Sequence, residues 1–359
     1  MTTRGEPIAP VRPIVIAGLV RRRPIVLVLA GVGALVVLIG AGVGLGSVAV
    51  TPGDTLGIVA SRMLGLDVTR TWSAATEAIV WELRLPRVLT AMVVGAGLAV
   101  AGATFQGLLR NPLADPYVLG TASGAALGAA IAIVIPVRLV VLEFGLLHGL
   151  AFLGALASVT AVYRLSRIGG MAPLTSLLLT GYALGSLLAA GLALAMYLSG
   201  AALREIFAYL LGSFDAASWG RLAGSAPLIV IGVLLVMTRA RALNGLLLGE
   251  ETATHLGVNV RRERAVLLAL ASLITAAAVA VSGLIGFVGL VVPHVVRLLV
   301  GPNARRVLPL SALLGAALMT FADLVARILA GIPVGVVTAV IGAPFFLVLL
   351  RRTRTGYEL

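Results

Sequence analysis

The chain has 359 residues, of which 60% are hydrophobic and 11% charged, whereas about a quarter of the residues in a soluble domain are charged. All 27 basic residues are arginine, and with 14 acidic residues the formal net charge is +13. In a membrane protein this excess indicates an anionic membrane face rather than nucleic acid, and the absence of cysteine excludes disulfides, iron–sulfur clusters and thiolate zinc sites. We therefore predict an integral membrane protein in which residues 1–359 form a single transmembrane domain.

The first predicted span follows a basic flank, Arg21 to Arg23. The apolar stretch 24–46 that comes next is longer than the roughly 7–15 residues that form the core of a cleavable signal peptide. We therefore predict that residues 1–23 form a cytoplasmic N-terminal tail and that residues 24–46 form the first transmembrane helix.

Apolar stretches bounded by Arg, Pro, Asn or Asp predict ten transmembrane helices, at about 20 residues for each crossing. A count of nine stays open, because residues 265–299 can also be read as one long bent helix. The predicted spans are 24–46, 86–107, 117–137, 145–163, 174–198, 226–238, 265–282, 284–299, 308–325 and 332–350.

The arginines that flank these spans indicate the orientation, because Lys and Arg near span ends are retained on the cytoplasmic side. With ten spans and the N-terminus inside, nineteen arginines lie on the cytoplasmic side and eight lie outside. Eight acidic residues also lie outside, so the whole formal charge faces the cytoplasm. We therefore predict that the N- and C-termini are both cytoplasmic.

The sequence offers little for catalysis. Its three histidines, His148, His255 and His294, are far apart, and no paired acidic motif lies inside a span. A phosphate loop of the GxxxxGK[ST] kind is impossible in its usual form without lysine. We predict no catalytic residue, no metal site and no cofactor bound by this chain, so that a partner must hydrolyse any nucleotide.

Three blocks with Gly and Pro punctuation stand out. Residues 84–128, RLPRVLTAMVVGAGLAVAGATFQGLLRNPLADPYVLGTASGAALG, contain a hinge whose two prolines end one helix and begin another. Residues 283–297, GLIGFVGLVVPHVVR, and residues 333–352, PVGVVTAVIGAPFFLVLLRR, are punctuated in the same way. These blocks resemble the FecCD family of type II ABC importer permeases, and the resemblance runs from about residue 50 to residue 352.

The resemblance implies an all-α integral membrane protein with about ten transmembrane helices in the type II ABC importer permease fold. It implies a bacterial inner-membrane subunit that pairs with a second copy of itself around a central path through the lipid bilayer. Two ATP-binding subunits, which hold ATP and Mg, and an extracytoplasmic substrate-binding protein complete the importer. Ferric siderophore, haem and vitamin B12 permeases share these motifs, so the blocks do not identify the chelate.

The resemblance also implies a docking site for the binding protein at three arginines. Arg84 and Arg87 lie at the start of the second predicted span, and Arg327 lies at the predicted outer end of the ninth. Arginine suits this role because it is always ionised and can hold a carboxylate with two hydrogen bonds. Alternatively, these residues anchor helix ends at lipid headgroups. The turn between Arg327 and Pro333 is shorter than relatives usually have, so the docking surface is expected to differ at that edge.

A polar segment at residues 249–264, GEETATHLGVNVRRER, separates two spans. It opens with acids and closes with arginines, as the helix dipole prefers. It is similar to the cytoplasmic coupling segment that contacts the ATP-binding subunits, although a solvated loop would have the same composition. The positions that we expect to contact the motor subunit are Glu250, Ala253, Leu256 and Gly257, with Leu256 as the apolar contact.

The resemblance places an inner gate at the hinge and at the start of the fifth span, at Asn111 and Leu113 and at Leu174 and Thr175. Small polar and apolar residues can close a pore without gripping a large ligand. Asn111 can equally cap the break before Pro112, which is a common local role for asparagine.

Two polar residues inside predicted spans also need an explanation. Gln106 either lines the translocation path or hydrogen-bonds to a neighbouring helix. Asp323 is expected to pair with Arg327 at i,i+4 rather than to bind an ion.

Two other classes of protein remain to be weighed. An ion-coupled secondary transporter normally needs acids or broken helices at the middle of the membrane to bind the driving ion, and the predicted spans lack such acids in their interiors. An intramembrane enzyme would need catalytic groups, for which His294 is the candidate to mutate.

Overall fold

The computed structural model describes residues 24–46, 48–135, 140–141, 144–167, 173–329 and 331–354. The predicted N-terminal tail at 1–23 lies outside the described residues. The elements in chain order are α2 (Pro24–Gly44), α3 (Pro52–Leu64), α4 (Ala74–Ala78), η1 (Ile79–Arg84), α5 (Leu85–Leu108), α6 (Thr121–Val134), β1 (Val140–Val141), β2 (Phe144–Gly145), α7 (Leu146–Leu165), α8 (Leu174–Leu198), η2 (Gly200–Ala202), α9 (Leu203–Leu211), α10 (Trp219–Thr238), α11 (Ala240–Leu247), α12 (Glu250–His255), α13 (Val260–Ser282), α14 (Val288–Val300), α15 (Ala304–Ile328) and α16 (Val334–Arg354).

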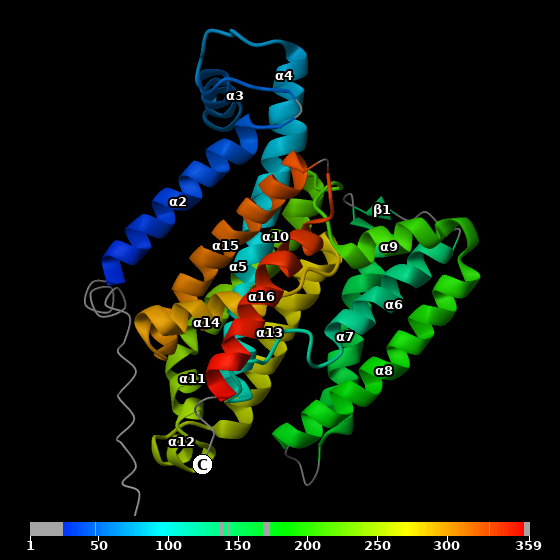
Figure 1. Ribbon diagram of the computed structural model, residues 1–359, viewed down its shortest axis with the longest axis vertical. Coiled ribbons are helices and arrows are strands. Elements are labelled where there is room, and N and C mark those ends of the chain that lie inside the picture. The colour runs from blue at the N-terminus through cyan, green and yellow to red at the C-terminus, as the bar shows by residue number, and fades with distance from the viewer. Residues whose placement is uncertain are drawn as a thin grey trace, which may run out of the picture.

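Each of the ten predicted spans corresponds to one helix. Seven of the helices are long and apolar enough to cross a membrane, and three apolar helices, α6, α14 and α16, are shorter. The described residues therefore form an all-α membrane protein, as predicted, with seven candidate spans and three shorter apolar helices at the ten predicted positions. The short helices α3, α4, α9 and α11 were not predicted; they connect the spans at the two ends of the bundle (Figure 1).

The reading of residues 265–299 as one long bent helix is wrong, because the chain breaks between α13 and α14. Gly283 and Phe287 both have positive φ, at 67° and 69°, a conformation that a right-handed helix does not contain. The end of α9 supplies a hydrogen-bond acceptor to the backbone of this break, since the Leu284 amide donates to the Tyr209 carbonyl oxygen at 3.3 Å. Irregular backbone is tolerated at membrane depth where protein covers it in this way, and Ile285 is 1% exposed.

Helix α5 is the centre of the bundle. In the continuous helical stretch 74–108, 78% of the most apolar window is buried, and α10, α13, α14 and α15 pack around it (Figure 1). Glycines permit the closest approaches, as small residues do in membrane bundles. A Cβ atom added to Gly95 would lie 2.3 Å from the Gly315 carbonyl oxygen on α15, and one added to Gly102 would lie 1.9 Å from the Gly289 carbonyl oxygen on α14.

Helices α2 and α8 form two edges of the bundle. Only 11% of the most apolar window of each is buried within the chain, and both expose large apolar side chains such as Leu29 and Leu187. Because apolar surface is favourable toward lipid or another apolar protein surface, these helices face the bilayer or a partner.

The two ends of the bundle carry different short helices (Figure 1). We call the end with α3 and α4 the α3 end, and the opposite end, with α11 and α12, the α12 end. A loop at 109–120, which we call the hinge, joins α5 to α6 and starts at the α12 end. The arginines expected to dock a binding protein and the segment expected to meet a motor subunit therefore lie at opposite ends.

Candidate functional site

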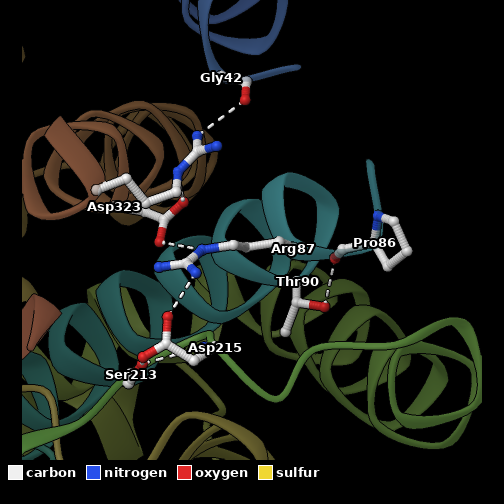
Figure 2. A network of polar contacts seen from close by, with 8 residues as sticks. Gly42, Pro86, Arg87, Thr90, Ser213, Asp215 and Asp323 are labelled. Carbon is white, nitrogen blue, oxygen red and sulfur yellow. Dashed lines mark hydrogen bonds and ion pairs between the residues drawn. The ribbon is translucent and has the colours of Figure 1, made fainter. Parts of the chain in front are cut away.

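The arginine corner at the α3 end is centred on Arg87, which joins acids from two other elements (Figure 2). Its Nε lies 2.8 Å from Asp323 Oδ1 on α15, and its Nη1 lies 2.5 Å from Asp215 Oδ1 in the loop between α9 and α10. Asp323 is 1% exposed, whereas the Asp215 side chain is 66% exposed. Arg87 therefore has one buried partner and one partner that solvent or another protein can reach.

Asp215 is held in place by its own loop. The Ser213 hydroxyl donates to Asp215 Oδ2 at 2.5 Å, and the Asp215 amide donates to Ser213 Oγ at 3.0 Å. Partial burial raises the pKa of the Asp215 carboxyl, but the Ser213 hydroxyl and the Arg87 guanidinium outweigh it and hold that pKa below its ordinary value of 3.8. Asp215 is thus ionised at neutral pH and faces Arg87 as a carboxylate.

The predicted pairing of Asp323 with Arg327 is confirmed. Arg327 Nε lies 3.2 Å from Asp323 Oδ2, one helical turn away on α15. The other end of the guanidinium turns toward α2, where Nη2 donates to the Gly42 carbonyl oxygen at 2.8 Å (Figure 2). Asp323 therefore lies between two arginines, which together compensate its burial.

Arg84 is buried, with 6% of its surface exposed, and it caps the end of α2. Its Nη1 donates to the carbonyl oxygens of Val43 and Gly44, both at 2.9 Å, and its Nη2 donates to the Val48 carbonyl oxygen. The last carbonyls of any helix lack amide donors from the helix itself. Arg84 and Arg327 supply donors to three of the last four carbonyls of α2, and the Leu45 amide supplies the fourth at Ala41.

The three arginines predicted for docking therefore share one corner but differ in what they contact. Arg84 and Arg327 donate to backbone oxygens of α2, while Arg87 holds the exposed carboxylate of Asp215. Asp215 was missed in the sequence because it lies 128 residues from Arg87. The role of the corner in docking stays a prediction.

At the α12 end, the predicted coupling segment contains α12, which is joined to α13 by an ion pair between Glu250 and Arg264. Ala253 is fully buried and fixes α12 against α11, whereas Leu256 is 62% exposed. Gly257 ends the helix with a φ of 77°, the left-handed conformation that glycine adopts at helix C-termini. Of the four predicted contact residues, Leu256 therefore offers the exposed apolar surface.

A cavity of about 540 Å³ lies beside this segment. Leu248, Leu256 and Val258 provide apolar surface to it, and α11 and α13 contribute charged groups. The charged residues that line it are Arg241, Arg262 and Glu263. Such a mixture of exposed apolar and charged groups is typical of a protein contact surface.

The hinge contains the predicted gate residues Asn111 and Leu113. Asn111 Oδ1 accepts a hydrogen bond from the Leu113 amide at 2.9 Å. Asn111 therefore caps the break around Pro112, which was the second of the two roles predicted for it. Leu174 and Thr175, the other predicted gate residues, lie in the first turn of α8 at the same end of the molecule (Figure 1). A gating role for the four residues stays a prediction.

Arg110, which the sequence did not single out, connects the hinge to α11, the helix that precedes the coupling segment. Its backbone has a φ of 47°, which is uncommon for a residue with a side chain. Its Nε donates to the Leu246 carbonyl oxygen on α11 at 2.9 Å. Local sequence gives no sign of this conformation, because the contact partner is 136 residues away.

A second polar contact fastens α11 to the rest of the bundle. Asn244 accepts a hydrogen bond from the Ala304 amide at 2.7 Å, and its side-chain nitrogen donates to Asn303 Oδ1 at 2.9 Å. Asn303 is the N-cap of α15. Helix α11 thus contacts the hinge through Arg110 and the start of α15 through Asn244.

Gln106 hydrogen-bonds to a neighbouring helix, which is the second of the two roles predicted for it. Its side chain is 2% exposed, its Nε2 donates to the Leu290 carbonyl oxygen on α14 at 3.1 Å, and its Oε1 accepts from Arg297. Arg297 also donates to the Ala103 carbonyl oxygen at 3.2 Å. These groups fasten α14 to α5 just before the hinge.

Comparisons with known proteins cover nearly the whole chain. A model of the FecCD transport family matches residues 34–352. The cobalamin import system permease protein BtuC of Halobacterium salinarum is 46% identical over 276 residues, which cover 77% of this chain and 74% of that protein. The hemin transport system permease protein HmuU of Yersinia pestis is 44% identical over 300 residues, which cover 81% and 90%.

A solved structure supports the same assignment of the fold. It shows an inward-facing conformation of a metal-chelate type ABC transporter, with a TM-score of 0.79 and 33% sequence identity. The match covers 92% of this chain and 99% of the other. The bundle described above is therefore similar to a transporter of known architecture along almost its full length.

Proposed function

Because the chain belongs to the FecCD transport family and is a permease subunit of an ATP-binding cassette importer, we propose that it carries a bulky metal chelate of the haem or cobalamin class. The observation that carries this proposal is the similarity at 44–46% identity to permeases whose names specify hemin and cobalamin. Both cargoes are macrocyclic metal complexes.

The proposed assembly contains two copies of this chain, two ATP-binding subunits that hold ATP and Mg, and a substrate-binding protein outside the membrane. The chain itself binds no cofactor and performs no covalent chemistry in this proposal. It lies in the bacterial inner membrane, with the α12 end and both termini in the cytoplasm. The positive-inside distribution of arginines supports this orientation.

The orientation is testable because the chain has no native cysteine. His255→Cys lies at the α12 end and Thr69→Cys near the α3 end, and both positions are exposed. We expect a membrane-impermeant thiol reagent to label Cys at 69 in intact spheroplasts and Cys at 255 only in inverted vesicles. Labelling of residue 255 on the face opposite to tags at the two termini would remove the basis for the transport assignment.

The surface at α11 and α12 is proposed to receive the ATP-binding subunit through Glu250, Ala253, Leu256 and Gly257. The exposed Leu256 side chain beside a cavity of about 540 Å³ supports this role. Leu256→Asp should lower the amount of ATP-binding subunit that co-purifies with the permease. Leu64→Asp is the matched control, because Leu64 is 71% exposed at the α3 end; equal losses in both variants would contradict the assignment.

The corner of Arg84, Arg87 and Arg327 is proposed to dock the binding protein, with Arg87 as the direct contact. In the free permease Asp215 occupies the position on Arg87 that an acidic residue of the binding protein takes in the complex. On docking, that acidic residue displaces Asp215 from Arg87. Arg84 and Arg327 fix the end of α2 beside this contact through their hydrogen bonds to its carbonyl oxygens. Arg87→Ala should weaken association measured with the purified binding protein. Asp215→Asn removes the exposed carboxylate partner of Arg87 and should strengthen it.

The gate is proposed to lie at the α12 end, where Asn111 and Leu113 of the hinge and Leu174 and Thr175 of α8 line the path. The hydrogen bond from Arg110 to α11 supports a direct mechanical connection between the hinge and the helix that precedes the coupling segment. Movement of α11 by the motor subunit would then displace the hinge without passing through the rest of the bundle.

Uptake into proteoliposomes tests the whole proposal. The purified complex with its binding protein should accumulate hemin or cobalamin only when ATP is enclosed on the cytoplasmic side. Uptake driven by a proton gradient without the ATP-binding subunit would instead identify an ion-coupled transporter. Loss of a covalent conversion of the substrate in His294→Ala would identify an enzyme.

A further inference from the structure

An apolar groove lies between α2, α14 and α15. Its volume is about 250 Å³, and every residue that lines it is apolar, including Leu27 and Ala34 on α2, Leu299 on α14, and Leu310 and Leu314 on α15. Because α2 is an edge helix with only 11% of its most apolar window buried, the groove is at the periphery of the chain. Its walls match the chemistry of a hydrocarbon chain.

The groove lies toward the α12 end of these three helices. Its residues come from the first half of α2, the last turns of α14 and the first half of α15, and these three segments meet at the lower left of Figure 1. A lipid in the groove would therefore belong to the leaflet at the α12 end.

Two arginines stand where this groove reaches the end of the bundle. Arg305 and Arg306 are exposed in the first turn of α15. Arg306 precedes Leu310 by four residues and Leu314 by eight, so the three side chains share one face of the helix. The first turn of α15 contains no acid, and among the described residues neither arginine takes part in an ion pair.

We propose that the groove and this arginine pair form a binding site for one anionic phospholipid. An acyl chain occupies the groove, and the phosphate group lies against Arg306 and Arg305. Arginine binds phosphate with strong, charge-assisted hydrogen bonds, and basic pockets between membrane helices bind anionic headgroups. Arg306 lies one helical turn before Leu310 of the groove wall, a separation that one lipid can span between its phosphate and its acyl chain. This site requires only that the chain spans a bilayer, so it does not depend on the transported substrate.

Native mass spectrometry of the purified full-length chain tests the site. The chain would be titrated with phosphatidylglycerol and with phosphatidylcholine of identical acyl chains. We expect one phosphatidylglycerol to bind in preference to phosphatidylcholine. The double variant Arg305→Ala, Arg306→Ala should weaken the binding of phosphatidylglycerol by about tenfold, equivalent to about 1.4 kcal/mol, and should leave phosphatidylcholine unaffected.

Matched variants separate the site from general effects of charge and size. Arg261→Ala removes an exposed arginine from the first turn of another helix, α13, and should leave lipid binding unchanged. Ala34→Phe fills the groove and should weaken the binding of both lipids, whereas Val37→Phe, on an exposed face of α2 outside the groove, should not.

Three results would overturn the proposal. They are equal binding of the two lipids, an equal effect of Arg261→Ala and of the double variant, and no effect of Ala34→Phe. Loss of the ATP-binding subunit from the double variant with unchanged lipid binding would also overturn it, because it would assign the arginines to a protein contact.

Discussion

The Gln106 side chain on α5 donates a hydrogen bond to the Gly289 carbonyl oxygen on α14, at 3.3 Å. Within α14 this carbonyl would normally accept from the residue four positions later, but that residue is Pro293, which has no amide hydrogen. Gln106 supplies the missing donor from another helix. Its Oε1 also accepts a hydrogen bond from the half-buried Arg297. One amide side chain therefore supplies a donor to a helix interrupted by proline and an acceptor to an arginine.

Gln106→Leu should therefore destabilise the protein. It leaves the Gly289 carbonyl and Arg297 without these partners, and an unsatisfied buried polar group costs about 1–3 kcal/mol. Unfolding in detergent, followed by circular dichroism, would measure the loss. Ser311→Ala is the control, because Ser311 is also fully buried but its hydroxyl has no hydrogen-bond partner among the described residues. Equal stability of the two variants would refute this role of Gln106.

Gly102→Ala should disrupt the contact between α5 and α14. The added Cβ would lie 1.9 Å from the Gly289 carbonyl oxygen, and since backbone is in the way, a side-chain rotation cannot relieve the overlap. We expect a loss of about 3 kcal/mol, at the upper end of the usual cost of overpacking. Gly33→Ala on α2, where nothing lies within 4 Å, should instead stabilise the helix by about 0.5–1 kcal/mol. Thermal unfolding of both variants would show opposite shifts.

The Arg87–Asp215 contact should make stability depend on pH at the acid end of the range. Because the pKa of Asp215 is lowered in the folded protein, its contribution is present above 3.8, its ordinary pKa, and is lost as the pH falls through the lower value. Asp215→Asn should thus reduce the unfolding temperature at pH 7 and converge with the original chain below pH 3.8. The effect should stay below about 1 kcal/mol, since the Asp215 side chain is 66% exposed. A difference between the two proteins that does not change with pH would contradict this account.

Arg110→Ala should separate ATP hydrolysis from transport. Removing its bond to the Leu246 carbonyl oxygen frees the hinge from α11, so uptake should fall severalfold while the complex still assembles and hydrolyses ATP. The ratio of substrate transported to ATP hydrolysed in proteoliposomes is the measurement. Arg164→Ala, which removes an exposed arginine from the last turn of α7, should leave the ratio unchanged. A parallel loss of hydrolysis and uptake would place Arg110 in assembly instead.

The spans could be predicted from the sequence because hydropathy is a local property of about 20 residues. The Asp323–Arg327 pair could be predicted for a similar reason, since residues four apart share a helix face. The break at 283–287 could not be decided, because two positive φ angles depend on how the end of α9 contacts the loop.

The candidate site was predicted less completely. Arg84 and Arg87 were predicted at the start of a span, but the helical stretch that contains them begins at Ala74. The sequence also could not show that Arg84 points inward to the end of α2. Asp215 and Arg110 were missed because their partners are more than 100 residues away in the chain.

The cap on α2 also has a consequence for biosynthesis. Gly42 is among the first residues to enter the membrane, yet its carbonyl oxygen is satisfied by Arg327, which is 285 residues later. The ribosome must therefore synthesise nearly the whole polypeptide before the first inserted helix acquires its final contacts. Truncated nascent chains that end before α15 should thus hold α2 through Arg84 and its contacts with α3, η1 and α5 alone, and completion of the ninth span fixes the first.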